Sequence, residues 1–100
     1  MTTVNTYTEH PMSDYRSLLG DGVQLVDVRE PEEVATGTLP DAVNIPLGEL
    51  PVRASELAAD RRVVLFCRSG GRSAQAAEYL IARGFGDVID LAGGMLAHQK

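Results

Sequence analysis

A short apolar run that leads into a pair of glycines constrains the fold of this chain most strongly. Residues 62–67 read Arg-Val-Val-Leu-Phe-Cys, and such a nearly continuous apolar run is typical of a central strand in a parallel sheet covered on both faces. Gly70 and Gly71 follow, and residues 73–83 then carry apolar side chains at helical spacing up to Gly84, which ends the helix. The segment therefore predicts a buried strand, a tight turn and a helix.

Shorter segments of the same two kinds alternate along the rest of the chain. Further strands are expected at 23–28, 43–45 and 88–91, with a weaker edge strand at 4–7. Further helices are expected at 13–19 with Ser13 as the N-cap, at 31–35 beginning with Pro31, and over part of 47–57, where Pro51 cuts or kinks the helix. This alternation over short connections predicts an α/β fold with a mostly parallel central sheet of about five strands flanked by helices.

The size and charge of the chain limit its domain count and its partners. Its 100 residues, 44% hydrophobic and 23% charged, suit one soluble globular unit, so residues 1–100 are expected to form a single domain. A formal net charge of -5 argues against nucleic-acid binding, which needs a basic face. Residues 1–10 lack the pattern of a signal peptide, and no stretch approaches the roughly 20 apolar residues of a membrane span. We expect a cytoplasmic protein that binds neither nucleic acid nor membranes.

The single cysteine, Cys67, ends the expected central strand. In open α/β sheets the ligand site lies beyond the carboxyl ends of the strands. The glycine pair lets successive backbone N–H groups from Arg68 to Ser73 point at one spot, which would form a cradle for an anion. These N–H groups, the helix N-terminus, Arg68 and Arg72 would lower the pKa of the thiol and favour the nucleophilic thiolate. The alternative interpretation of Cys67 is one more buried apolar residue at a strand end.

Four segments in order along the chain resemble the rhodanese domain. They are residues 27–33, residues 37–46, the loop 66–73 that contains Cys67, and residues 91–95. The resemblance implies the three-layer rhodanese α/β fold, a persulfide on Cys67 and a substrate-binding loop from Arg68 to Arg72. The chain departs from the family pattern in having Thr38 where His is common, Asp41 where Gly is common, and His98 where Trp often occurs. These departures leave the rim of the site and any partner surface open.

The reaction expected on these grounds is that of a thiosulfate sulfurtransferase. Sulfane sulfur would pass from an anionic donor, such as thiosulfate or a low-molecular persulfide, through Cys67 to cyanide or a thiol acceptor. Asp27, Arg29 and Glu33 are expected to support this end of the sheet through hydrogen bonds and an ion pair. No cofactor and no metal is expected. The expected substrate-binding residues are Arg68, Ser69, Gly70, Gly71, Arg72 and Ser73.

Two other functions use the same features. The domain could act as a sulfur carrier or an interaction module that works with a protein partner, and one sequence does not decide between this and a small acceptor. Phosphatase or arsenate-reductase chemistry also uses a Cys thiolate followed by Arg. In the related family that chemistry needs five residues between the two, whereas four separate Cys67 from Arg72. The shorter loop favours sulfur transfer.

Overall fold

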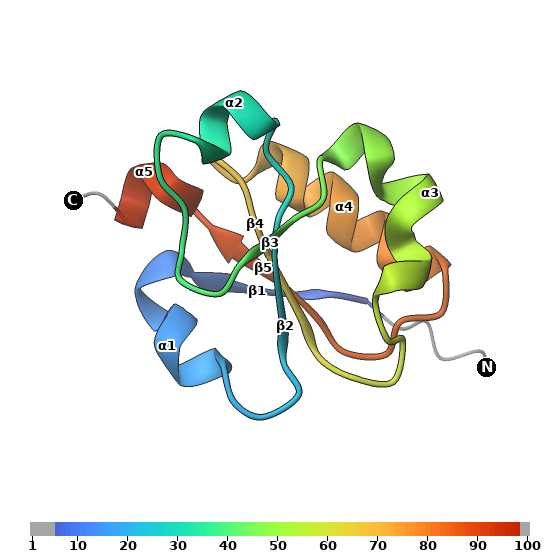
Figure 1. Ribbon diagram of the computed structural model, residues 1–100. Helices are drawn as coiled ribbons and strands as arrows, with labels where there is room; N and C mark the ends of the chain where they lie inside the picture. Colours follow the sequence, from blue (N-terminus) through green and yellow to red (C-terminus); the bar gives the residue numbers. More distant parts are fainter. Residues whose placement is uncertain (1–5, 99–100) are drawn as a thin grey trace.

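Five parallel strands form the central sheet of the computed structural model, which describes residues 6–98 (Figure 1). Their order across the sheet is β1-β5-β4-β2-β3, and every neighbouring pair is parallel. The prediction of an α/β fold with a parallel sheet is therefore confirmed. The strands are β1 (Thr8–Pro11), β2 (Gln24–Asp27), β3 (Val43–Asn44), β4 (Val63–Phe66) and β5 (Val88–Ala92).

Helices cover both faces of this sheet and make the three layers. The helices are α1 (Tyr15–Leu18), α2 (Pro31–Val34), α3 (Leu50–Arg53), α4 (Gly71–Ala82) and α5 (Gly94–His98), with 3-10 turns η1 (Met12–Asp14), η2 (Leu47–Glu49) and η3 (Ala54–Glu56). One buried cluster joins α3 and α4 to the sheet, and a second joins η1, α1 and α5 to the opposite face. No helix within residues 6–98 combines the length and apolar character needed to cross a membrane.

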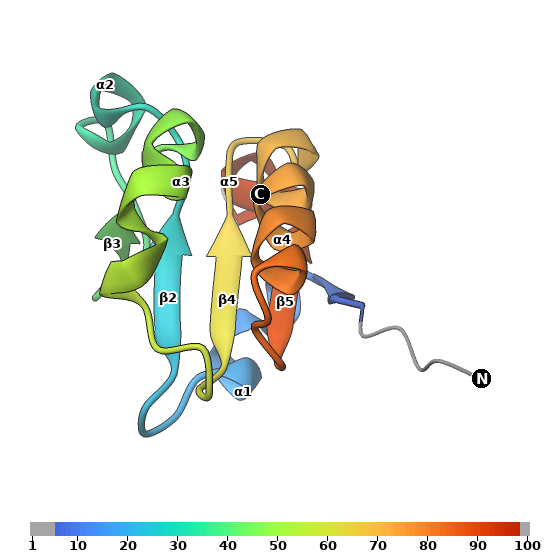
Figure 2. The same cartoon turned by 90° about the vertical axis from the view of Figure 1, so that its right-hand side faces the viewer.

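The central strand β4 positions the turn that follows it. All four of its residues are buried, and they alternate between the two clusters: Val63 and Leu65 face α4, whereas Val64 and Phe66 face the other layer. Figure 2 shows β2 and β4 side by side, with their carboxyl ends directed toward α2 and toward the turn into α4. The expected strand covered on both faces is confirmed, and it delivers Cys67 to this edge of the sheet.

Two expectations about the N-terminal part are wrong. The edge strand lies at Thr8–Pro11 rather than at 4–7, and residues 4 and 5 lie outside the described part of the chain. It pairs only with β5, and an edge strand tolerates the missing N–H of Pro11. Ser13 is not an N-cap, because it lies inside η1, which continues into α1.

The helix bounds differ from expectation mainly at turns. Helix α4 begins at Gly71 instead of residue 73, because Gly70 adopts φ 120° and turns the chain into the helix. The expected helical segment at 47–57 consists of three short turns, and Pro51 lies in the first turn of α3. A proline is tolerated there because a first-turn N–H has no partner within the helix. Pro51 therefore helps to start α3 rather than cutting it.

Candidate active site

Cys67 lies directly after β4, at the floor of the turn that leads into α4. The residue is only 1% exposed and belongs to the buried cluster beneath α4. Its backbone carbonyl accepts a hydrogen bond from the N–H of Met95 at 2.9 Å, which holds the strand end against α5. The position of the sulfur is therefore determined by the core and by two flanking helices.

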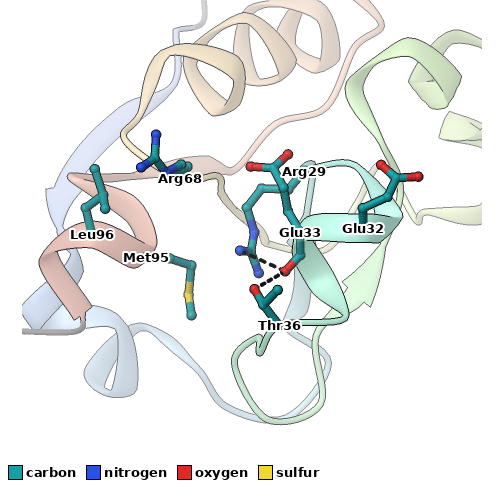
Figure 3. Close-up of a pocket in the computed structure, with 7 residues that line it drawn as sticks. All are labelled: Arg29, Glu32, Glu33, Thr36, Arg68, Met95 and Leu96. Carbon is teal, nitrogen blue, oxygen red and sulfur yellow. Dashed lines mark hydrogen bonds between the residues drawn. The ribbon is translucent and has the colours of Figure 1, made fainter.

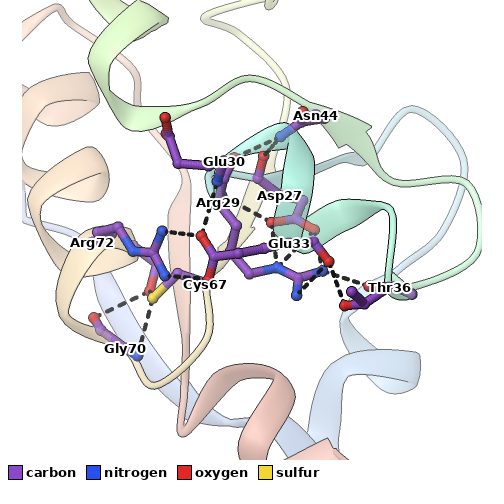
Figure 4. Close-up of polar contacts among 11 residues, drawn as sticks. Asp27, Arg29, Glu30, Glu33, Thr36, Asn44, Cys67, Gly70 and Arg72 are labelled. Atoms are coloured by element: carbon purple, nitrogen blue, oxygen red, sulfur yellow. Dashed lines mark hydrogen bonds and ion pairs between the residues drawn. The ribbon is translucent and has the colours of Figure 1, made fainter.

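The turn brings backbone donors to the sulfur. The N–H of Gly70 donates to Cys67 Sγ at 3.0 Å, as Figure 4 shows. A φ of 120° at Gly70 is strongly disfavoured for residues with a Cβ, so the glycine is needed for this geometry. The sequence predicted a cradle of N–H groups from residues 68 to 73, and those of Ser69, Gly70 and Ser73 act on the sulfur.

Opposing effects set the pKa of the Cys67 thiol. Burial alone raises it, because a thiolate loses its hydration. The hydrogen bond between Sγ and the Ser73 hydroxyl, together with those from the backbone N–H groups of Ser73, Gly70 and Ser69, lowers it and outweighs burial. The pKa therefore lies below its ordinary value of 9.0, which favours the nucleophilic form.

Ser73 connects the sulfur to a second buried acid. Its Oγ lies 3.4 Å from Cys67 Sγ, 3.2 Å from the carbonyl oxygen of Gly70 and 2.5 Å from Oδ1 of Asp90 on β5. Asp90 is 1% exposed, and sequence reasoning missed it as a site residue. The available signal was a lone carboxylate within an apolar strand, because a buried charge requires a partner.

Arg72 is held by a carboxylate from another element. Its Nη1 and Nη2 donate to Oε1 and Oε2 of Glu33 at 2.6 and 2.9 Å, and this bidentate pair joins α4 to α2 (Figure 4). The hydrogen bond from Arg72 is the main reason that the pKa of Glu33 falls to about 2. The Arg72 guanidinium is thus positioned near the turn, with part of its charge already neutralised.

A buried ion pair lies beneath α2. Arg29 Nε donates to Oδ1 of Asp27 at 3.0 Å and Arg29 Nη2 donates to Oδ2 at 2.8 Å, and both residues are buried. Thr38 also donates to Asp27 Oδ2, at 2.8 Å. The sequence predicted that Glu33 would take part in this ion pair, but the hydrogen bond that Glu33 accepts from Arg29 Nη1, at 3.4 Å, is to its backbone carbonyl. Its carboxylate turns to Arg72 instead, so this network supports the site through the position of α2.

A pocket opens beside the turn, between α2 and α5 (Figure 3). Arg68 and Leu96 lie on one side of it, and Glu33 and Thr36 lie on the other. Within residues 6–98 the Arg68 guanidinium forms no hydrogen bond or ion pair, and the residue is exposed. Of the two arginines that follow Cys67, Arg68 therefore carries the charge that is not neutralised.

The close approach of α5 to the turn depends on Gly94. Its φ is +51°, and a Cβ there would overlap the carbonyl oxygen of Cys67 and lie 2.7 Å from that of Arg68. The N–H groups of Met95 and Leu96 donate to these same two carbonyls at 2.9 and 3.0 Å. The Gly93-Gly94 pair thus closes the back of the turn.

Comparisons with known proteins show which family the chain resembles. Residues 12–100 match the family described as the rhodanese-like domain. The chain is 49% identical over 80 residues to a sulfurtransferase of Allochromatium vinosum, covering 80% of this chain and 75% of that protein. It is 33% identical to the thiosulfate sulfurtransferase GlpE of Pseudomonas syringae, covering 84% and 79%.

A solved structure shares the architecture. The crystal structure of a rhodanese-like domain protein from Staphylococcus aureus superposes with a TM-score of 0.80 at 33% identity, covering 92% of this chain and 89% of that one. The family match spans most of the chain, including all the residues around Cys67, and the fold agrees with it. The chain therefore belongs to the rhodanese-like domain family.

Proposed function

We propose that the protein transfers sulfane sulfur from an anionic donor to a nucleophilic acceptor through a persulfide on Cys67. The observation that carries the proposal is a buried thiol whose sulfur accepts the Gly70 N–H at 3.0 Å and whose pKa is lowered by such hydrogen bonds. Names among the relatives support the reaction class, since one is a sulfurtransferase and another a thiosulfate sulfurtransferase. Thiosulfate is therefore the first donor to test.

The first step forms the persulfide. The Cys67 thiolate attacks the outer sulfur of thiosulfate, a new S–S bond forms, and the donor's own S–S bond breaks. Sulfite leaves with the electron pair of the broken bond. The N–H groups that stabilise the thiolate are placed to stabilise the terminal sulfur, which then carries the negative charge. No base is required, because the lowered pKa of Cys67 supplies thiolate and sulfite is a stable anion.

The second step returns the enzyme to its starting state. Cyanide or a thiolate attacks the terminal sulfur of the persulfide, and the bond between that sulfur and Cys67 Sγ breaks. Its electron pair stays on Cys67 as thiolate, in the hydrogen-bonded state that the turn already stabilises. The covalent intermediate separates the two half-reactions. Kinetics of the ping-pong type are therefore expected, with thiocyanate as the product from cyanide, and Cys67→Ser is expected to abolish product formation.

The two arginines have different roles in this proposal. Arg72 is held by Glu33, whereas the exposed Arg68 lines the pocket, has no ion-pair partner among residues 6–98, and is suited to attract the donor anion. Arg68→Ala is expected to raise KM for thiosulfate about two- to fivefold, the range of one exposed charge contact, while kcat changes little. Arg61→Ala is the matched control, because Arg61 is exposed and lies before β4, at the end of that strand opposite to the Cys67 turn. Equal KM values for the two variants would remove Arg68 from donor binding.

The acceptor and the competing chemistry are tested with the same preparation. If persulfide forms but neither cyanide nor small thiols discharge it, the acceptor is a protein and the domain acts as a sulfur carrier. Hydrolysis of an aryl phosphate that disappears in Cys67→Ser would contradict the proposal in favour of phosphatase chemistry. Four residues between Cys67 and Arg72 argue for sulfur transfer in that comparison.

A further inference from the structure

Asp90 is a buried acid that the proposed reaction does not use. The residue is 1% exposed and lies on β5, beside the central strand. Within residues 6–98 no Lys, Arg or His forms an ion pair with it. Its partner is instead the hydroxyl of Ser73, whose Oγ lies 2.5 Å from Asp90 Oδ1. A buried carboxyl without a cation needs an explanation, because its ionised form is costly there.

The Ser73 hydroxyl cannot serve all of its neighbours at once. It has one proton to donate, and three acceptors surround it: Asp90 Oδ1 at 2.5 Å, the Gly70 carbonyl at 3.2 Å and Cys67 Sγ at 3.4 Å. When Asp90 is ionised, the carboxylate attracts the proton most strongly, and the thiol donates its own proton to Ser73 Oγ. When Asp90 is protonated, the carboxyl donates to Ser73, and the hydroxyl proton is available for a thiolate.

We propose that Asp90 is a positioning residue which, through the single proton of the Ser73 hydroxyl, controls whether Cys67 is a thiol or a thiolate. The two acids then share one negative charge. As Cys67 ionises, its S–H bond breaks and the proton binds Ser73 Oγ, while the original Ser73 proton passes to Asp90 Oδ1. The charge moves from the carboxylate to the sulfur, and no proton has to reach solvent. The catalytic meaning of this exchange rests on the proposed function.

Groups around Asp90 support storage of a proton there. Burial raises the pKa of Asp90, the hydrogen bond from Ser73 opposes that effect, and the nearby charge of Glu9 raises the pKa further. Glu9 lies opposite Asp90 on β1, and Leu65 lies opposite it on β4. Tyr7, whose own pKa is raised mainly by desolvation, also feels the charge of Asp90. No positive charge among these neighbours favours the ionised carboxylate.

The pH dependence of Cys67 alkylation by iodoacetamide tests the inference without any sulfur donor. Asp90→Asn removes the competing charge, so its alkylation at pH 6.5 should be about three- to tenfold faster than that of the wild type, as expected when one nearby negative charge is removed from a partly screened site. Asp60→Asn is the matched control, because it makes the same substitution at an exposed carboxylate in the loop before β4, at the end of that strand farthest from the Cys67 turn. Its alkylation profile should overlie that of the wild type.

A double-variant cycle shows whether the effect passes through Ser73. Ser73→Ala should slow alkylation, and Asp90→Asn should accelerate it less in that background than in the wild type. An Asp90→Asn profile identical to the wild type, or the same acceleration with and without Ser73, would overturn the inference. If thiosulfate transfers no sulfur to Cys67 but the pH profiles of alkylation shift as expected, only the proposed function fails. If sulfur is transferred but the alkylation profiles do not shift, only this inference is overturned.

A measurement on the wild type covers the case in which Asp90→Asn does not fold. The carboxyl carbon resonance of Asp90 should show a second inflection at the pH where Cys67 ionises, because the two groups share a proton. Cys67→Ser should lose that second inflection. A single inflection that is unchanged in Cys67→Ser would overturn the inference.

Discussion

At Cys67, burial and hydrogen bonding change the pKa of the thiol in opposite directions. A thiolate that is 1% exposed loses most of its hydration, and the N–H groups of the turn replace the lost water as donors. This exchange requires that the turn keep its shape, since Gly70 N–H is useful only at its 3.0 Å distance from Sγ. The chemistry of the residue thus depends on glycines that carry no reactive group.

Gly94 tests whether α5 has to lie close to the Cys67 turn. Gly94→Ala places a methyl group against the carbonyls of Cys67 and Arg68 at a positive φ, and we expect it to lower the free energy of unfolding by about 1–3 kcal/mol. Gly48→Ala is the control, because nothing lies within 4 Å of a Cβ there and its φ is not positive. Urea denaturation of both variants measures the difference. A Gly94→Ala protein as stable as the control would show that α5 can move away from the turn freely.

At the scale of elements, the Glu33–Arg72 pair connects the short helix α2 to the first turn of α4. Helix α2 has four residues, none of them buried, so its position depends on polar contacts. The Asp27–Arg29 network holds one side of it, and Arg72 of α4 holds the other. Since both contacts end at Glu33, this residue aligns the pocket wall with the Cys67 turn.

The pair has a defined pH window. Its carboxyl has a pKa lowered from 4.5 to about 2, so its contribution to stability is present above pH 4.5 and is lost as pH falls through about 2. Glu33→Gln is therefore expected to cost about 0.5–1 kcal/mol at pH 7, as for a half-buried pair, with a smaller cost at pH 3. Urea unfolding at both values measures this. A cost that stays the same at pH 3 would exclude the charge of Glu33 as its source.

Elements of strong periodicity were predictable from the sequence, whereas contacts between distant segments were not. The β4 run and the α4 pattern correctly located the turn that contains Cys67. The edge strand at Thr8–Pro11 was predicted too early, at 4–7, because its residues carry no apolar alternation and its partner β5 lies about 80 positions away. Asp90 was missed for a related reason, because only the parallel pairing of β4 with β5 brings it beneath Ser73.

For the whole molecule, one sheet joins two buried clusters that lie on its opposite faces. Leu80 belongs to the cluster under α4, and Leu91 belongs to the cluster next to α1 and α5. Strand β4 contributes side chains to both, so neither cluster is complete without the same strand. The two faces should therefore unfold together, and the Cys67 turn should persist only in the folded state.

Two core substitutions test this cooperativity. Leu80→Ala and Leu91→Ala each remove a side chain that is 0% exposed, and each is expected to cost about 2–5 kcal/mol in a single unfolding transition. Val52→Ala, at a position that is 83% exposed, should change stability by no more than about 0.5 kcal/mol. Far-UV circular dichroism and cysteine accessibility are followed together in urea. Transitions that separate for either core variant would contradict one cooperative unit.

The mass of the intact protein after incubation with thiosulfate tests the central claim most directly. The account predicts one added sulfur atom per chain, no addition in Cys67→Ser, release of one sulfite per sulfur bound, and return to the original mass when cyanide is added. A wild-type protein whose mass is unchanged after thiosulfate and after a low-molecular persulfide, while Cys67 is still alkylated by iodoacetamide, would contradict it.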